Sequence, residues 1–220
     1  MSTIIKSSLA RKYAMALSGL FLVFFLLQHF TINLTSVFSE AAFNELSHFM
    51  GNNPLVQFVL QPILIFGVVF HFVMGFILDL KNRSARSTKY ALNKGSANSS
   101  WMSRNMIISG GVVLSFLVLH FYDFWIPEMN YKYVEVLPQN PDRYFEEMVH
   151  KFENPVRVGL YVLSFGFLAL HLLHGFSSSF QSLGANNKYT RAIKGATTTF
   201  ALGISLGFVF IALFHHLTAF

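Results

Sequence analysis

Residues 18–33 read SGLFLVFFLLQHFTIN, an almost unbroken apolar run that contains a single histidine, His29. The run belongs to an apolar segment over about 13–36, which is long enough to cross a hydrocarbon core of roughly 30 Å as one helix. An ionisable side chain inside such a helix is costly and usually has a function. The segment therefore predicts a membrane helix with a functional histidine.

Four further apolar segments of similar length follow, over about 55–80, 104–126, 155–181 and 192–216. The chain of 220 residues is 53% hydrophobic and 12% charged, which is far from the composition of a soluble domain. We predict an all-α membrane protein whose five transmembrane helices form a single domain over residues 1–220. No low-complexity tract and no strict repeat is expected.

The basic residues are distributed unequally between the two sides of this predicted bundle. Twelve of the 16 lysines and arginines fall in the N-terminal tail and the loops after the second and fourth helices, including the segment 82–103. Such residues prefer the cytoplasmic side, so we expect a cytoplasmic N-terminus and an outer C-terminus. The net charge of +6 thus indicates topology and a docking surface, not nucleic-acid binding. The largest outer loop is expected over 127–154, and a short outer amphipathic helix over 37–54.

Three other helices carry a histidine at the same depth as His29. His71, His120 and His171 each lie 16 residues after the expected start of their helix, or about 24 Å along it. Because successive helices run in opposite directions, His29 and His120 approach the outer face, whereas His71 and His171 approach the inner face. Two pairs of imidazoles predict two non-covalent haems b in a four-helix bundle, with the fifth helix as an addition.

An ion transporter is the main alternative explanation of intramembrane histidines. Transporters usually place carboxylates beside such histidines, but the nearest acids, Asp79 and Asp123, fall close to the predicted helix ends. His174 competes with His171 as a ligand, one turn nearer the inner surface. The chain has no cysteine, which excludes covalent haem attachment through C-x-x-C-H and any iron–sulfur cluster held by its own thiolates.

The fifth helix has no central histidine. It carries Gly203 and Gly207 in a G-x-x-x-G pattern, which indicates helix packing or dimerisation. It ends in His215 and His216, which we expect at the membrane interface.

At this point the residues resemble a known family. The Q-H-x-x-x-N pattern around His29, the central histidines of the next three helices and HLLHG around His171 are similar to the di-haem cytochrome b subunit of succinate:quinone oxidoreductases, the cytochrome b558 family. The resemblance covers essentially the whole chain. In helix four of that family a glycine follows the ligand by four residues, which fits His171 with Gly175 and not His174.

The resemblance implies a membrane anchor in a bacterial cytoplasmic membrane. A flavoprotein subunit with covalent FAD would interconvert succinate and fumarate, a reaction of the tricarboxylic acid cycle, and an iron–sulfur subunit would pass electrons to this chain. Both partners would sit on the cytoplasmic side, with the segment 82–103 as part of their docking surface, and the complex could dimerise. Quinone, expected to be menaquinone, would exchange electrons near the outer haem.

The remaining site residues follow from the needs of quinone and haem. Glu45, at the outer entry to the second helix, is the candidate proton carrier at the quinone. Arg104 near the inner face and Arg157 near the outer face are candidate partners of the haem propionates. Ala169 stands where some relatives carry a glutamate, which argues against a proton path there. A di-haem subunit of a hydrogenase or formate dehydrogenase is the alternative.

Overall fold

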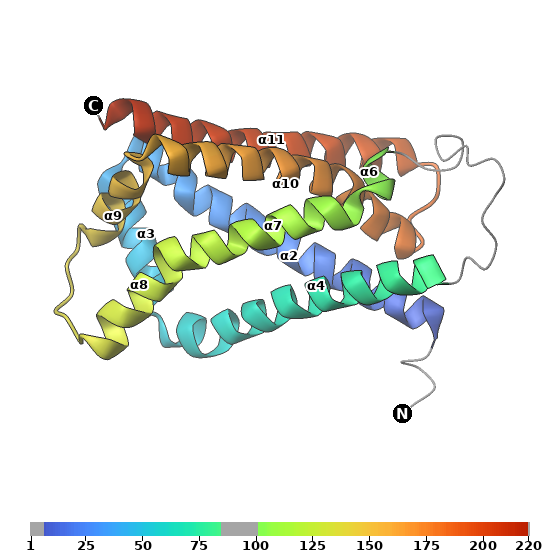
Figure 1. Ribbon diagram of the computed structural model, residues 1–220, viewed down its shortest axis with the longest axis horizontal. Coiled ribbons are helices and arrows are strands. Elements are labelled where there is room, and N and C mark those ends of the chain that lie inside the picture. The colour runs from blue at the N-terminus through green and yellow to red at the C-terminus, as the bar shows by residue number, and fades with distance from the viewer. Residues whose placement is uncertain (1–6, 85–100, 220) are drawn as a thin grey trace.

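Five long helices make up most of the computed structural model, which describes residues 7–84 and 101–219 and contains no strand within those ranges. Each of the five is long and apolar enough to cross a membrane, which confirms the predicted number of spans. Figure 1 shows them gathered lengthwise into one bundle. They are α2 (Ser8–Phe38), η1 with α4 (Val56–Ser84), the third span (Met106–Val134), α10 (Pro155–Ser182) and α11 (Thr190–Thr218).

Side-chain caps set where several helices begin. Ser39 closes α2 with its backbone N–H and opens α3 (Glu40–Asn52), because its hydroxyl accepts the N–H of Ala42 at 3.2 Å. The short amphipathic helix predicted over 37–54 is therefore confirmed. Asn154 caps α10 in the same way, with Pro155 at the first helical position, where a missing N–H costs nothing.

The third span is longer than predicted. The apolar segment predicts an end at about residue 126, just before Pro127, which cannot donate a backbone hydrogen bond. Instead, a π-helical turn precedes the proline, in which the Ile126 N–H bonds to the carbonyl of Phe121, and the helix continues to Val134. Its parts are α7 (Met106–His120), η2 (Phe121–Trp125), α8 (Ile126–Met129) and η3 (Asn130–Val134).

The predicted outer loop over 127–154 is wrong at its start, whereas its end is confirmed, because α10 begins at Pro155. Residues 127–134 belong to the third span, and α9 (Arg143–Phe152) occupies half of the rest. The helix α9 is amphipathic, and it buries Met148 and Phe152 against the bundle. Residues 135–142 and the two residues 153–154 remain as irregular connections.

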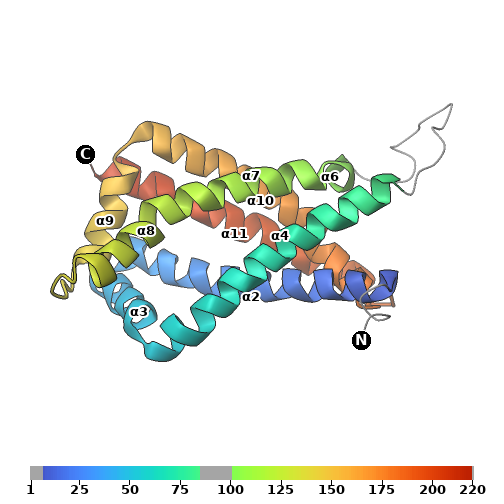
Figure 2. The same ribbon diagram turned by 60° about the horizontal axis from the view of Figure 1, so that its bottom comes forward.

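Helix α10 lies at the centre of the assembly, in contact with α2, α7 and α11. Helix α4 packs against α2, which it crosses obliquely in Figure 2, and also contacts α7. Phe24 on α2 and Phe66 on α4 are about 70% exposed, at 73% and 69%, as expected for helices surrounded by lipid. The four helices α2, α4, α7 and α10 carry the central histidines, and α11 covers α2 and α10.

Gly207 allows α11 to approach α2 closely. A methyl group in its place would clash with the ring of Phe30 on α2. Gly203, one turn earlier, has no heavy atom within 4 Å of the corresponding position. The G-x-x-x-G pattern predicts helix packing or dimerisation. Gly207 packs against another helix of the same chain.

The two ends of the bundle differ. Figure 1 shows the end of α11 together with α3 and α9, whereas the start of α2 lies at the opposite end with the end of α4 and α6 (Trp101–Arg104). The basic segment predicted as a docking surface, 82–103, lies mostly outside the described residues, which resume at Trp101.

Candidate functional site

His29 on α2 and His120 on α7 face one another inside the bundle. Their ring centroids are 5.7 Å apart and their planes are inclined at 84°. Each ring stacks on a phenylalanine one helical turn earlier, Phe25 at 5.5 Å and Phe116 at 5.7 Å. Nδ1 of His120 is buried and has no hydrogen-bond partner among the described residues. These two residues form the outer histidine pair.

His71 on α4 and His171 on α10 form a second pair, the inner histidine pair. Their ring centroids are 6.4 Å apart and their planes are inclined at 70°. His174, the competing candidate, has its Nε2 3.2 Å from the hydroxyl of Ser178 on the same helix. The histidine whose ring meets His71 is therefore His171.

Two serines contact the inner pair from neighbouring helices. The hydroxyl oxygen of Ser18 on α2 lies 3.0 Å from Nδ1 of His71. The hydroxyl oxygen of Ser109 on α7 lies 3.3 Å from Nδ1 of His171. Neither serine is among the site residues predicted from the sequence.

A repeated pattern in the sequence could have identified these serines. The pattern M-x₂-S-G-x₅-F-x₃-H occurs at residues 15–29 and again at 106–120. The pattern H-x₃-G occurs at 71–75 and 171–175. Most positions between the shared residues differ, so these are sparse patterns and not a strict repeat.

The separation of the rings fits two ligands on opposite sides of one metal ion. With metal–imidazole bonds of about 2 Å, two such rings have centroids about 6 Å apart. The observed separations are 5.7 and 6.4 Å. In residues 7–84 and 101–219, no group of three or more His, Asp or Glu side chains is placed to hold a metal ion. Each pair instead supplies two imidazoles, the number that a haem iron accepts beyond its porphyrin.

Two glycines face the rings of the inner pair. A methyl group at Gly19 would lie 3.3 Å from Cε1 of His71, which is tighter than most contacts, whereas one at Gly110 would lie 3.5 Å from Cε1 of His171, which is an ordinary contact. The backbone of α2 therefore approaches His71 more closely than most other residues would allow. Together with the unpartnered Nδ1 of His120, this makes both pairs suitable places for a flat cofactor.

A buried carboxylate lies beside the outer pair. Asp123, in the π turn that follows His120, has a fully buried side chain. Its Oδ2 accepts a hydrogen bond from the Tyr161 hydroxyl at 2.9 Å and lies 3.3 Å from Nε of Arg157. Asp123 was expected near a helix end, but because the third span continues to Val134 it lies well inside that span.

The two predicted propionate partners, Arg104 and Arg157, and the predicted proton carrier, Glu45, lie in different parts of the bundle. Arg157 is paired with Asp123, so its charge is balanced within the protein. Arg104 is exposed on α6, at one end of the bundle in Figure 1, and Glu45 is exposed on α3 at the other end. The roles assigned to these three residues stay predictions.

His215, expected at the membrane interface, is instead buried. Its side chain is among the most deeply enclosed in the described part of the chain, with 2% of the residue exposed. Its Nε2 lies 2.8 Å from the hydroxyl of Ser36 on α2, and that hydroxyl donates to the carbonyl of Asn33. His215 therefore joins α11 to α2.

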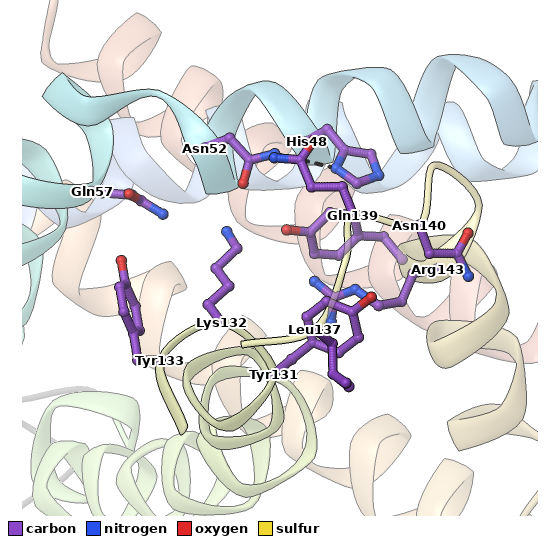
Figure 3. A pocket seen from close by; sticks show the side chains of 11 residues that line it. His48, Asn52, Gln57, Tyr131, Lys132, Tyr133, Leu137, Gln139, Asn140 and Arg143 are labelled. Atoms are coloured by element: carbon purple, nitrogen blue, oxygen red, sulfur yellow. Dashed lines mark hydrogen bonds between the residues drawn. The ribbon is translucent and has the colours of Figure 1, made fainter. Parts of the chain in front are cut away.

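A polar pocket of about 270 Å³ lies at the same end as α3 and α9. In Figure 3 the side chains of Gln57, Lys132 and Tyr133 point toward one space. The lining residues are His48, Asn52, Gln57, Tyr131, Lys132, Tyr133, Leu137, Gln139, Asn140, Arg143 and Tyr144.

Two carboxylates, Glu128 and Glu147, balance the two cations of this pocket, Lys132 and Arg143, with Oε1 of Glu147 lying 3.0 Å from Nη1 of Arg143. Glu128 accepts hydrogen bonds from Arg143 and from the Tyr144 hydroxyl, and lies 2.5 Å from Nζ of Lys132. Burial would lower the pKa of Arg143, but the hydrogen bond and charge of Glu128, together with the charges of Glu147 and Tyr144, outweigh burial and raise it. Burial and the same carboxylate raise the pKa of Tyr144, which keeps its hydroxyl a neutral donor. The cluster therefore fixes the third span to α9.

Compared with known proteins, the chain matches no family model, no curated protein and no solved structure.

Proposed function

We propose that this chain is a di-haem cytochrome b that carries electrons across a membrane. The observation that supports it best is the meeting of four histidines from four helices as two pairs, with ring centroids 5.7 and 6.4 Å apart. Placing four imidazoles inside a membrane is costly, so they are expected to have a function. Two pairs at the spacing of metal ligands provide one, because each pair can hold one haem iron.

The residues of this chain define what the bound haems can do. His29 and His120 would hold the outer haem, and His71 and His171 the inner haem. When bound, each haem supplies a one-electron carrier. Two protein ligands on each iron leave no open position for a substrate, so the arrangement favours electron transfer over chemistry at the metal. The surrounding helices leave all four histidines only partly exposed.

The excess of basic residues supports the end of α4 and the start of α2 as the cytoplasmic end. The inner pair would then receive or deliver electrons on the cytoplasmic side, and the outer pair on the other side. Movement between the pairs would cross part of the membrane field, which is worth about 2.3 kcal/mol per charge per 100 mV. Turnover should therefore respond to the membrane potential.

The family resemblance supports a specific place for this electron carrier. The chain would anchor the flavoprotein and iron–sulfur subunits of a succinate:quinone oxidoreductase in a bacterial cytoplasmic membrane. FAD and iron–sulfur clusters would reside on those partners. Quinone, expected to be menaquinone, would react near the outer pair, with Glu45 as its proton carrier. Arg104 and Arg157 remain the proposed partners of the propionates, and for Arg157 this would require sharing with Asp123.

The two alternatives differ from this proposal in observable ways. A subunit of a hydrogenase or formate dehydrogenase would have the same haems and a different soluble partner. An ion transporter would have no haem. Asp123 is a carboxylate within a span, as a transporter would need, but it is already paired with Arg157 and Tyr161. This pairing favours a structural role for Asp123.

A reduced minus oxidised visible spectrum of the purified chain, with pyridine haemochrome quantitation, tests the proposal. Two haems b per chain are expected. A well-folded preparation without haem would overturn the cytochrome assignment and favour the transporter. Co-purification of a subunit with covalent FAD would support the succinate:quinone oxidoreductase, whereas a nickel or molybdenum partner would support the alternative respiratory enzymes.

A further inference from the structure

The two halves of the haem-carrying bundle are built alike. Helices α2 and α7 share the pattern M-x₂-S-G-x₅-F-x₃-H, and α4 and α10 share H-x₃-G. The histidine that ends the first pattern belongs to the outer pair, and the histidine that begins the second belongs to the inner pair. The serines of the first pattern, Ser18 and Ser109, occupy equivalent places beside the inner pair.

The hydrogen bonds of the two serines have the same direction. Ser18 donates its hydroxyl proton to the carbonyl of Met15 at 2.9 Å, and Ser109 donates to the carbonyl of Met106 at 2.9 Å. With each hydroxyl proton on the carbonyl of its own helix, each oxygen is free to accept from the imidazole nearby. This arrangement places the imidazole proton on Nδ1 of His71 and of His171.

We propose that Ser18 and Ser109 are positioning residues for the inner haem. By accepting the Nδ1 proton they hold both imidazoles in the tautomer whose Nε2 lone pair is free, and they fix the orientation of the rings. This inference rests on the proposed function, because it assigns the free Nε2 atoms to a haem iron. Each serine acts through its histidine and contacts no reacting atom.

Helices α2 and α7 each contribute to both histidine pairs. Helix α2 supplies an outer ligand and also the serine for His71 on α4, whereas α7 supplies an outer ligand and the serine for His171 on α10. Substitution of one serine therefore leaves every ligand in place while removing a bond to one inner ligand.

The outer pair lacks an equivalent partner. Nδ1 of His120 is buried without a hydrogen bond among the described residues, and the ring stacks on Phe116 instead. At His29, the amide nitrogen of Asn33 lies 3.4 Å from Nε2, so this contact is to the other ring nitrogen. The serines should therefore affect the inner haem alone.

The bond from Nδ1 to serine has an electronic consequence. A hydrogen-bond acceptor on Nδ1–H increases the basicity of the imidazole and so its donation to the iron. Stronger donation stabilises the oxidised iron over the reduced iron, which lowers the reduction potential of that haem. Loss of a serine should therefore raise the potential of the inner haem.

The experiment compares Ser18→Ala and Ser109→Ala with Ser115→Ala in the full-length chain. Ser115 is a matched control, because it lies on α7 and donates to a carbonyl of its own helix at 3.0 Å, but contacts no histidine. Each variant is analysed by haem content, redox titration and electron paramagnetic resonance of the oxidised haems. A His120→Ala background, in which only the inner haem is expected, identifies which titration step belongs to it.

We expect both serine variants to retain two haems and to shift the inner step to higher potential, with a larger shift in the double variant. The resonance of the inner haem should also change, because it depends on the relative orientation of the two ligand rings. Ser115→Ala should titrate as the parent chain does. Ser18→Thr, which keeps a hydroxyl, should restore the parent potential.

Several outcomes would overturn the inference. An unmoved inner step, an equal shift of both steps or a similar shift in Ser115→Ala would each exclude a specific role for the serines. If Ser18→Ala lost the inner haem, rescue by Ser18→Thr would support positioning, and failure of that rescue would indicate packing alone. A parent chain without haem would instead refute the proposed function, so the two failures are distinguishable.

Discussion

The imidazoles of His29 and His120 meet across α2 and α7 with their ring centroids 5.7 Å apart, although the two residues belong to the first and third spans. If they hold the outer haem, His29→Ala or His120→Ala should reduce the haem content from two per chain to one. The haem that remains should be the inner one, because His71 and His171 lie on other helices. Pyridine haemochrome quantitation and redox titration measure both results.

His150 provides a control for these substitutions. It is exposed on α9 and its Nδ1 lies 3.1 Å from Glu153 at the end of the same helix. His150→Ala should keep both haems. Loss of the inner haem alone from His29→Ala would show that the pairing is wrong.

His171 and His174 form a matched comparison on one helix. His171 meets His71, whereas His174 contacts Ser178. His171→Ala should therefore lose the inner haem, and His174→Ala should keep two haems with unchanged ligand resonances. Loss of the inner haem in His174→Ala alone would instead identify His174, one helical turn away, as the ligand.

Much of this site could be predicted from the sequence because the information was local. The length of each apolar run gives the span, and the rise of 1.5 Å per residue gives the depth of His29, His71, His120 and His171. The depth of each histidine and the direction of its helix together predict which histidines lie close to one another. In the structure His29 lies beside His120 and His71 beside His171, which are the predicted pairs.

Other features could not be predicted because they depend on contacts between helices or on an irregular turn. The burial of His215 depends on Ser36, which lies on another helix. The end of the third span depends on a π turn that lets the helix pass Pro127, whereas the rule for proline predicts a stop. The serines beside the inner pair were overlooked because serine is common in membrane helices, and only the repeat distinguishes Ser18 and Ser109.

The buried carboxylate Asp123 should contribute to stability. Asp123→Asn would leave the Arg157 guanidinium without its ion pair, which is expected to cost about 1–3 kcal/mol, less than for a fully buried pair because Arg157 is partly exposed. Tyr161→Phe would remove a hydrogen bond to this buried carboxylate at a cost of about 1.5–3 kcal/mol. Thermal unfolding in one detergent measures both losses.

Asp79→Asn is the matched control for Asp123. Asp79 pairs with Arg83 at 2.7 Å near the end of α4, where both side chains are substantially exposed. Such a pair contributes less than about 1 kcal/mol, so the melting temperature should hardly move. Equal losses in the two variants would contradict the idea that burial gives the Asp123 pair its importance.

The absence of cysteine makes the orientation of the chain directly measurable. Ser84 is exposed at the end of α4, and Gln139 is exposed in the connection between η3 and α9, so the two residues mark opposite ends of the bundle. A membrane-impermeant maleimide should label Gln139→Cys in intact cells, and should label Ser84→Cys only after the membrane is opened. This result is expected because basic residues cluster beside Ser84 and favour the cytoplasm. Labelling of Ser84→Cys in intact cells would invert the topology and place the inner histidine pair on the outer side.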